Sequence, residues 1–530
     1  MEFIESFKKT ITFIIVVVFP AVIVSLILTD AAKEDATLNH LREEFYQERF
    51  TSIDHALLKD LQRDFDSPHE VTATCLSCHT GRGEEVMNTA HWNWEREEYI
   101  EGKGIVHLGK KNLINNFCNG TRSNEGTCNR CHIGYGWSDK TFDFDNPYNI
   151  DCLVCHDNTG LYRKASGGAG YPPTGDQAPD YRNIVQHVGR PTKYNCGSCH
   201  FMGGGGNNVK HGDLEVALLN CDRHVDVHMA KDGPDMACVD CHTTERHQMK
   251  GKYFASSTSN RDRAHCEDCH GGVPHVNQKL NEHTVKVDCR TCHIPVFAKV
   301  NATKMYWDWT TAGRLENGEP MTLYDDDGNI SYLSIKGDFI WERNVTPEYV
   351  WFNGNANRHL ITDKIDVDTL EINTLYGSYE DYNSKIIPVK VHRGKQPYDI
   401  HNKTLVQLNV WNTKEGTGAF WLDFDFNQAI KNGMEYVGMP YSGEYGFIDT
   451  KVYLPLSHMV SKAEDALQCQ DCHTRQNSRM AYVTGVYVPG KSHHSQIGFF
   501  GRTLIILALS GIMIHAFFRL IKRNKQTKTP

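Results

Sequence analysis

The chain has 530 residues and a formal net charge of −9, with acidic and basic residues mixed along its length. This charge balance indicates no basic surface for nucleic acid, so nucleic acid is excluded as an expected partner. The length predicts several domains. The chain also contains 18 cysteines and 28 histidines, and their arrangement says more about its chemistry than the overall charge does.

The first predicted element is an apolar segment at residues 11–29, which is long enough to cross a bilayer and follows Lys8 and Lys9. A basic start, an apolar stretch and then Ala31-Ala32 are also typical of a cleaved signal peptide. The apolar stretch is long and no Ala-x-Ala motif precedes the acidic stretch after it. The sequence therefore favours an uncleaved anchor, with residues 1–10 in the cytoplasm.

Residues 30–70 are predicted to form a helical lead-in to an exported region. Between Leu38 and Phe65, apolar residues recur at helical spacing among many charged residues. This pattern is typical of an amphipathic helix.

Eight copies of Cys-x-x-Cys-His follow, seven within residues 71–300 and the eighth within residues 453–484. In this motif both thiols attach covalently to a haem, and the histidine becomes the proximal ligand of its iron. Zinc sites also contain Cys-x-x-Cys pairs, but zinc does not require a histidine after every second cysteine. The chain is therefore predicted to be a multihaem c-type cytochrome with eight covalent haems c, numbered 1 to 8 in chain order. The predicted haem-binding residues are Cys75, Cys78 and His79; Cys128, Cys131 and His132; Cys152, Cys155 and His156; Cys196, Cys199 and His200; Cys238, Cys241 and His242; Cys266, Cys269 and His270; Cys289, Cys292 and His293; and Cys469, Cys472 and His473.

The haem motifs also determine the expected compartment and fold class. They use sixteen of the 18 cysteines and leave Cys118 and Cys221 unassigned. Haems c are attached outside the cytoplasmic membrane, so an exported domain is expected. Because the first seven motifs occur about once per 31 residues, porphyrin faces are expected to replace much of an aliphatic core. We predict a mainly α fold with much irregular structure, organised around stacked haems.

Residues 301–452 contain no haem motif and interrupt the haem-binding sequence. They hold alternating, aromatic-rich runs, separated by turn sequences such as Asp-Asp-Asp-Gly and Asn-Gly-Asn. Such runs are typical of β-strands joined by turns. We expect a partly β insertion that covers the haem core.

The C-terminal region is predicted to end in a membrane helix. A tether at residues 485–496 leads into an apolar segment at residues 497–520, which contains Arg502 and His515. His515 is interpreted either as a ligand for haem b or a quinone contact, or as a tolerated polar residue. The basic tail at residues 521–530 and the basic N-terminus place both ends in the cytoplasm by the positive-inside bias. The predicted location is the cytoplasmic membrane, in contact with lipid, with the haem domain on the periplasmic or extracellular side.

Twenty histidines remain after the proximal ligands are subtracted, and low-spin haems need a second axial ligand. Histidines close to haem motifs are the candidates, although any one of them could instead be an ordinary hydrogen-bonded residue. The predicted distal ligands are His91, His211, His228, His247, His275, His283, His392 and His458. Histidines without such a context are interpreted as ordinary, for example His40, His55, His359, His493 and His494.

Several further motifs surround the haem-binding units. They are His91-Trp92-Asn93-Trp94, KNLINNFC at 111–118, HIGYGW at 132–137, DCLVCHD at 151–157, HFMGGGG at 200–206 with VKHGD at 209–213, CHIP at 292–295 and HRGKQ at 392–396. In this order they resemble octahaem c-type cytochromes of the tetrathionate reductase type, which are related to hydroxylamine oxidoreductase and multihaem nitrite reductases. The resemblance covers about residues 74–313 and resumes at about 388–473. Both predicted membrane segments depart from the soluble members of that family, which leaves the electron donor open.

The resemblance implies that haem 2 is catalytic and has a lysine amine as its distal ligand. The Gly-rich run places this role on Lys210, with Lys164 as the second choice, and puts Asn115 and Cys118 near the site. A neutral amine is more easily displaced than imidazole, and burial favours the neutral form. The alternative interpretations are a surface lysine after a flexible loop and an inert buried cysteine.

We therefore expect a membrane-anchored respiratory reductase that acts on a small inorganic anion. The reaction is tetrathionate reduction to thiosulfate, or nitrite or hydroxylamine reduction, with a quinol-oxidase-type protein or another cytochrome as electron donor. Octahaem relatives that oxidise hydroxylamine carry a tyrosine crosslinked to a haem. Here only Tyr482 and Tyr487 follow the last motif, and no long C-terminal haem-domain helix is predicted, so hydroxylamine oxidation is disfavoured. The alternative function is an electron conduit without catalysis, in which every haem has two histidine ligands. An oligomer is compatible with the sequence.

Overall fold

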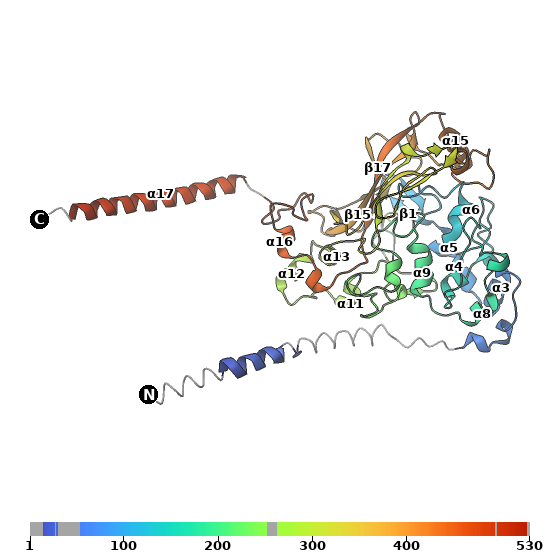
Figure 1. Cartoon of the computed structure of the whole chain (residues 1–530), viewed down its shortest axis with the longest axis horizontal. Coiled ribbons are helices and arrows are strands. Elements are labelled where there is room, and N and C mark those ends of the chain that lie inside the picture. The colour runs from blue at the N-terminus through green and yellow to red at the C-terminus, as the bar shows by residue number, and fades with distance from the viewer. Residues whose placement is uncertain (1–13, 27, 30–52, 252–261, 493–494, 527–530) are drawn as a thin grey trace. The chain divides into compact units, whose positions relative to one another are not determined.

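The structure is a computed structural model that describes residues 14–26, 28–29, 53–251, 262–492 and 495–526 (Figure 1). It divides into two compact units, Met1–Ala466 and Leu467–Pro530. The first unit contains haem motifs 1 to 7 and the insertion, and the second contains motif 8 and the C-terminal helix. Lys8, Lys9, Lys528 and most of the predicted lead-in helix lie outside the described residues.

Most helices are short, and all eight haem motifs lie on them or on adjoining 3₁₀ turns. In a helical turn, residues three apart share a face, so the two cysteines of each motif point to the same side and can reach one haem. The helices are α3 (Pro68–Cys78), α4 (Arg82–Met87), α5 (Ala90–Asn93), α6 (Glu125–Cys128), α7 (Leu153–His156), α8 (Tyr181–Gln186), α9 (Lys193–His200), α10 (Cys238–Cys241), α11 (Glu267–His270), α12 (Gln278–His283), α13 (Cys289–His293), α14 (Phe420–Asp423), α15 (Phe426–Val437), α16 (Cys469–Cys472) and α17 (Ser495–Gln526).

The strands form one large sheet and four small hairpins or ladders. The large sheet has the order β13-β17-β15-β5-β10-β9-β8, and β11 and β16 also pair with β15. Figure 1 shows β15 and β17 on one side of the first unit and short helices such as α9 and α11 on the other. The strands are β1 (Arg96–Ile100), β2 (Gly104–Leu108), β3 (Thr244–Glu245), β4 (Gln248–Met249), β5 (Thr303–Asp308), β6 (Leu315–Glu316), β7 (Glu319–Pro320), β8 (Thr322–Tyr324), β9 (Ile330–Leu333), β10 (Gly337–Glu342), β11 (Glu348–Phe352), β12 (Ala356–Arg358), β13 (Thr369–Glu371), β14 (Asn373–Leu375), β15 (Lys385–Asp399), β16 (Thr404–Leu405) and β17 (Tyr445–Pro455).

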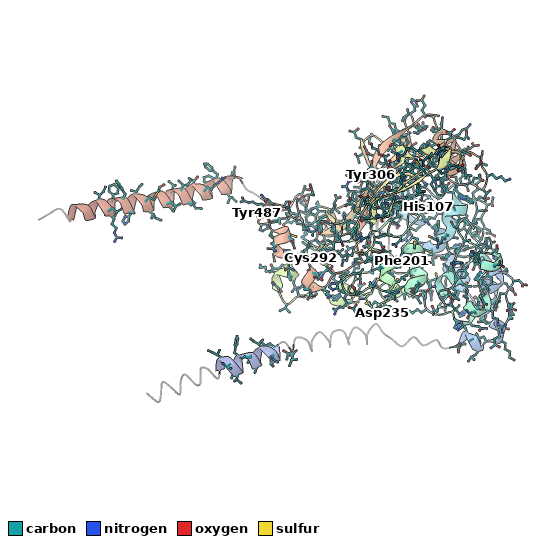
Figure 2. The ribbon with its side chains drawn as sticks, in the orientation of Figure 1. His107, Phe201, Asp235, Cys292, Tyr306 and Tyr487 are labelled. Carbon is teal, nitrogen blue, oxygen red and sulfur yellow. The ribbon has the colours of Figure 1, made fainter. Side chains whose placement is uncertain are left out.

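The content is thus mixed helix and strand, which corrects the prediction of a mainly helical fold. The reason is the insertion, whose strands form a sheet around β15 rather than scattered pieces. Strand β15 pairs antiparallel with β17 over eleven residue pairs, from Val389–Pro455 to Asp399–Tyr445. Figure 2 marks Tyr306 on the neighbouring strand β5 and Cys292 of haem motif 7.

The sheet has its own aromatic core, which needs no haem to bury it. Trp307 and Trp309 stack with ring centres 4.7 Å apart, and Phe420 packs on Phe426 at 4.1 Å. These rings are buried against one face of α15. Burial of this apolar area stabilises the sheet, which positions the residues that face the haems.

Within the described residues, one helix is long and apolar enough to cross a membrane, at Gln496–Lys522. The apolar helix at Ile15–Leu26 is shorter than that criterion requires. By length and composition the C-terminal helix is a candidate membrane anchor. The N-terminal anchor remains a prediction, because part of it lies outside the described residues.

The predicted topology can be tested with protease. In sealed vesicles, protease added to the cytoplasmic face is expected to cut only near Lys8 and Lys9 and between Lys522 and Lys528, because the membrane shields everything between the two anchors. Immunoblots against each end, with haem staining of the remaining fragment, would report the cuts. Release of an intact haem domain by salt washing alone would contradict membrane anchoring.

Candidate haem-binding and catalytic site

Three proximal histidines are held in the ring orientation that a haem ligand needs. Nδ1 of His156, His242 and His473 donates to the backbone carbonyls of Gly189, Lys250 and Pro489 at 2.8, 2.9 and 2.8 Å. Since a carbonyl can only accept, these nitrogens carry the proton and Nε2 is left to bind metal.

Six pairs of histidines face each other across a nearly constant distance. With metal–nitrogen bonds of about 2.0–2.1 Å on each side, two imidazoles on one iron have ring centres roughly 6 Å apart. Every pair joins one motif histidine to one histidine outside the motifs. The residues present therefore fit six haems with two histidine ligands each. The ring-centre distances are 6.2 Å for His55–His79, 6.1 Å for His91–His200, 6.5 Å for His156–His247, 6.0 Å for His228–His270, 6.4 Å for His242–His458 and 6.3 Å for His275–His293.

Five of the predicted distal ligands occur in these pairs, although sequence proximity does not identify their haems. His247 lies five residues after His242, yet it faces His156 of haem 3 rather than haem 5. His91 faces haem 4, and His458 faces haem 5. The ligand pairs are thus formed by tertiary contacts between separate motifs.

His55 was interpreted as ordinary from the sequence, but the structure places it opposite His79 of haem 1. Its 3₁₀ turn begins at Asp54, whose side chain accepts from the amide of Ala56 at 2.9 Å. The following Leu61 is buried against Ile184 of α8, which brings the turn back to haem 1. His55 lies twenty residues before Cys75, so the sequence did not indicate that it is a distal ligand candidate for haem 1. The one feature that could have suggested this role is its position before the first motif.

The other three predicted distal ligands are placed differently. His392 is buried in strand β15 with its ring 6.2 Å from that of Phe117, and its ring nitrogens make no hydrogen bond with the described residues. Burial, together with Lys390 and Lys304, holds the pKa of His392 well below its usual range. No ring contact joins His392 to a motif histidine within the described part of the chain, and its ligand role also remains a prediction. His211 adjoins Lys210, and His283 is exposed at the end of α12; their ligand roles remain predictions.

Haem 2 has a different environment, because His132 faces no second histidine among the described residues. Its ring is enclosed by aromatic side chains, and burial followed by the charge of Lys164 lowers its pKa to about 3. His132 is therefore a neutral imidazole. Its ring centre lies 4.8 Å from Trp137, 5.3 Å from Trp92, 5.4 Å from Trp94, 5.7 Å from Phe142 and 6.1 Å from Phe144.

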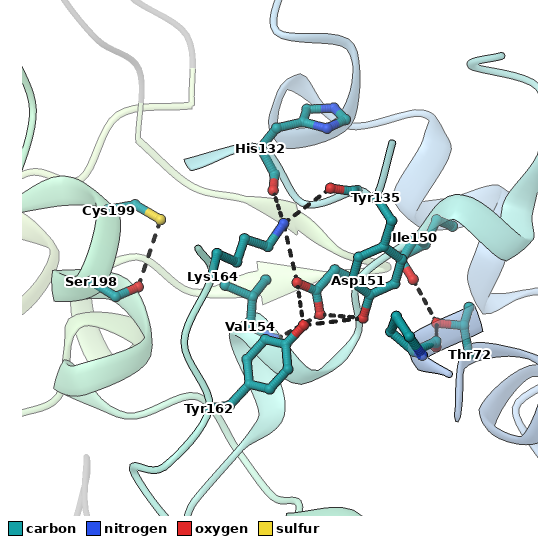
Figure 3. A network of polar contacts seen from close by, with 12 residues as sticks. Thr72, His132, Tyr135, Ile150, Asp151, Val154, Tyr162, Lys164, Ser198 and Cys199 are labelled. Atoms are coloured by element: carbon teal, nitrogen blue, oxygen red, sulfur yellow. Dashed lines mark hydrogen bonds and ion pairs between the residues drawn. The ribbon is translucent and has the colours of Figure 1, made fainter. Parts of the chain in front are cut away.

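A buried ion pair supports the chain beside His132 (Figure 3). Nζ of Lys164 lies 3.1 Å from the Asp151 carboxylate and donates to the carbonyls of His132 and Gly134. Tyr135 and Tyr162 donate to the two oxygens of Asp151 at 2.8 and 3.0 Å. With its amine engaged in this way, Lys164 is poorly suited to be the distal ligand of haem 2.

Lys210 approaches the same region from the Gly-rich loop. A Cβ on Gly203 would lie 3.2 Å from Cδ of Lys210, so the loop passes close to the lysine chain. Nζ of Lys210 lies 5.6 Å from the ring centre of Phe117 and interacts electrostatically with Cys118 and with Cys131 of haem motif 2. Desolvation, with repulsion from nearby cations, lowers the pKa of its amine to about 7. A substantial neutral fraction, the form that binds metal, follows at neutral pH.

The predicted residues Cys118 and Asn115 lie on the segment that precedes haem motif 2. Cys118 packs beside Phe117 and Ile114, and its charge interacts with Cys128 and Lys210. Asn115 is held by Arg358, whose Nη2 donates to Oδ1 of Asn115 at 2.6 Å. The structure therefore gathers Lys210, Cys118 and haem motif 2 in one region.

The sequence did not reveal three buried basic side chains that the insertion adds to this region. Arg358 on β12 is 2 % exposed, and Lys304 on β5 donates to the carbonyl of Phe117 at 3.3 Å. Lys390 on β15 donates to the carbonyl of Val209 at 2.9 Å, directly before Lys210. Burial lowers the pKa of both lysines well below the usual value. No motif marks them, because each occupies an ordinary strand position.

Cysteines of different motifs lie close together and give the order of the motifs in the first unit. Cys75 lies beside Cys152, which brings motif 1 to motif 3. Motif 4 adjoins motifs 2, 3 and 5, since Cys196 interacts with Cys155 and Cys238 while Cys199 lies beside Cys131. Further contacts, Cys241 with Cys269 and Cys266 with Cys289, continue the series through motifs 6 and 7. Two branches, 1–3 and 7–6–5, therefore meet at motif 4 beside motif 2.

The motifs, histidine pairs and fold define a multihaem c-type cytochrome. Residues 304–476 match the family of bacterial cytochrome c. The chain is similar to the octaheme cytochrome c from Shewanella oneidensis, with 43% identity and a TM-score of 0.73 over 80% of this chain and 94% of that one. It belongs to the octahaem cytochromes c of the tetrathionate reductase family. No curated protein matches the chain.

Haem stoichiometry is a direct test of the motif assignment. Each of the eight motifs has both cysteines and the histidine, so the intact mass of the purified protein is expected to exceed that of the apo-chain by eight haem groups. A Cys469→Ala/Cys472→Ala variant should lose one haem mass and keep the other seven. Stoichiometric zinc with fewer haems would contradict the assignment.

Proposed function

We propose that this chain is a membrane-anchored octahaem reductase that reduces a small inorganic anion at haem 2. The observation that carries the proposal is the environment of His132. Six other motif histidines each face a second histidine, whereas His132 faces none among the described residues, and Lys210 with its lowered pKa lies in the same region. A haem with a displaceable amine ligand can open a coordination site for substrate, which a haem with two imidazole ligands does less readily.

The charges near Lys210 favour an anionic substrate. Lys110 and Arg358 are among the cations that act on Lys210. We infer that tetrathionate is the preferred substrate. Two electrons supplied by the haems cleave its central S–S bond and give two thiosulfate ions, so the total negative charge doubles. Fixed cations therefore stabilise the transition state more than the substrate.

Nitrite and hydroxylamine are the other candidate substrates at this site. Their reduction consumes protons as well as electrons. Lys210 lies after the Gly-rich loop, and with a pKa of about 7 it can exchange a proton near neutral pH. The cationic surroundings favour nitrite over neutral hydroxylamine. The alternative to catalysis is an electron conduit, which the six histidine pairs and the candidate C-terminal anchor would also suit.

Low-temperature EPR of the purified full-length protein distinguishes these functions. A reductase is expected to show one haem signal unlike those of haems with two histidine ligands, and this signal should change when tetrathionate or nitrite is added. Turnover with a reduced dye as donor should then rank tetrathionate, nitrite and hydroxylamine. Eight signals typical of two histidine ligands, with no turnover, would establish the conduit instead.

A further inference from the structure

The distal ligand of haem 5 is backed by a buried carboxylate. Asp213 is 2 % exposed, and its Oδ2 accepts from the amides of Ser457 and His458 at 2.7 and 2.9 Å. The same oxygen lies 3.3 Å from Nδ1 of His458, which donates to it. Asp213 is three residues after Lys210, so one loop supplies an amine to the haem 2 region and a carboxylate to the ligand of haem 5.

Haem 3 has the same arrangement on the other branch. Nδ1 of His247, the histidine opposite His156, donates to Oε2 of Glu85 at 2.9 Å. Glu85 is in turn held by Arg82 at 2.6 Å. On the haem 5 branch a further carboxylate, Asp226, lies 4.0 Å from Nδ1 of His228 of haem 6.

Haem 4, between haems 3 and 5, lacks this arrangement. No described carboxylate hydrogen-bonds to His91 or His200, the two histidines of its pair at 6.1 Å. The ligands of haems 3 and 5 are therefore backed by a carboxylate, whereas those of haem 4 are not.

We propose that Asp213 and Glu85 are positioning residues that lower the reduction potentials of haems 5 and 3, so that electrons from both branches collect at haem 4. A carboxylate that accepts from the distal imidazole makes it a stronger donor, and its charge stabilises ferric iron over ferrous iron. Haem 4 has no such carboxylate among the described residues, so its potential is expected to stay above those of haems 3 and 5. Electron flow is thereby directed toward haem 2, whichever anion is reduced there, so this inference goes beyond the proposed substrate.

The test is a potentiometric titration of the full-length haem-loaded protein, followed by EPR. Asp213→Asn removes the charge but keeps an oxygen for the two amides, and it is expected to raise the potential of one haem and leave the others unchanged. The planes of His242 and His458 are 33° apart, whereas those of His156 and His247 are 75° apart. This angle sets the EPR anisotropy: the smaller angle, at haem 5, gives the more rhombic signal, and the larger angle, at haem 3, gives the more anisotropic one. The shift in potential should therefore appear in the rhombic signal for Asp213→Asn and in the anisotropic signal for Glu85→Gln.

Two further variants separate charge from folding. Asp213→Glu keeps the charge, so the potential of haem 5 should stay close to that of the unmodified protein. Asp399→Asn changes a buried carboxylate that accepts backbone amides of His401, Asn402 and Ser442, but touches no haem ligand, and it should move no potential. The proposal is overturned if Asp213→Asn and Glu85→Gln leave every potential in place, or if Asp399→Asn shifts the same haems equally. Unchanged potentials overturn this inference whether or not turnover changes, whereas the expected shifts in a protein that reduces none of the anions would count against the proposed function alone.

Discussion

Replacing Lys210 by Leu is expected to lower anion turnover by well over tenfold and to change the spectrum of one haem in eight. The substitution removes the amine but keeps an apolar side chain of similar bulk beside Phe117. A tenfold loss corresponds to about 1.4 kcal/mol of transition-state stabilisation. The remaining haems should keep their low-spin spectra, because their histidine pairs do not involve the Gly-rich loop's lysine. Turnover with a reduced dye and EPR of the same sample would measure both effects.

A nearby lysine provides the matched control for this experiment. Nζ of Lys336 would lie 3.4 Å from a Cβ on Gly205, so Lys336 approaches the same Gly-rich loop. Lys336→Leu removes a cation of similar position and is expected to leave the haem 2 spectrum unchanged. If Lys210→Leu left the spectrum and turnover intact, haem 2 would not be ligated by Lys210, and the conduit function would be favoured.

Haem attachment was predictable because the chemistry is local. Cys-x-x-Cys-His places every required group within five residues, and the structure forms each motif on a helical turn that orients both cysteines alike. The family was predictable for the same reason, from contiguous motifs around Cys118 and Lys210, and the comparison with a solved octaheme cytochrome c confirms it.

Distal ligation was only partly predictable, because it depends on contacts between motifs. His247 looks like a partner for haem 5 by sequence and faces haem 3 in space. His55 reaches haem 1 only because Leu61 is buried on α8, and no local pattern around His55 records that packing. His392 lies at a buried position of β15, which its sequence context did not indicate, and its ligand role stays a prediction.

The insertion was predicted only in outline. The alternating, aromatic-rich runs predicted strands, and Thr303–Asp308 does form β5, but the 15-residue strand β15 was not predicted. Its residues are buried on both faces, so they lack the alternation that marks a half-exposed strand. The basic residues Lys304, Lys390 and Arg358 were not predicted either. Each contacts the segments around Phe117, Val209 and Asn115 only in the folded insertion, so no local sequence pattern marks them.

The second large effect is expected when Lys164 is replaced by Met. The side chains of Lys164 and Asp151 are 2% and 0% exposed, so the variant leaves a carboxylate buried without its cation. Breaking a buried pair from one side costs about 3–5 kcal/mol. Burial and the charge of Asp151 raise the pKa of Tyr135 well above its usual value, so Tyr135 stays a neutral donor and only partly compensates. Urea unfolding followed by haem absorbance, compared with the unmodified chain, would measure the loss.

A double variant, Lys164→Met with Asp151→Asn, tests whether the loss comes from the uncompensated charge. Neutralising both partners removes the buried charge, so the double variant should recover part of the lost stability. EPR of these variants also separates the two lysines. If Lys164 only supports the backbone at His132 and Gly134, haem 2 keeps its unusual signal in every folded Lys164 variant. If Lys164→Met removed that signal while Lys210→Leu preserved it, Lys164 would be the distal ligand and the buried ion pair would have to open when haem 2 binds.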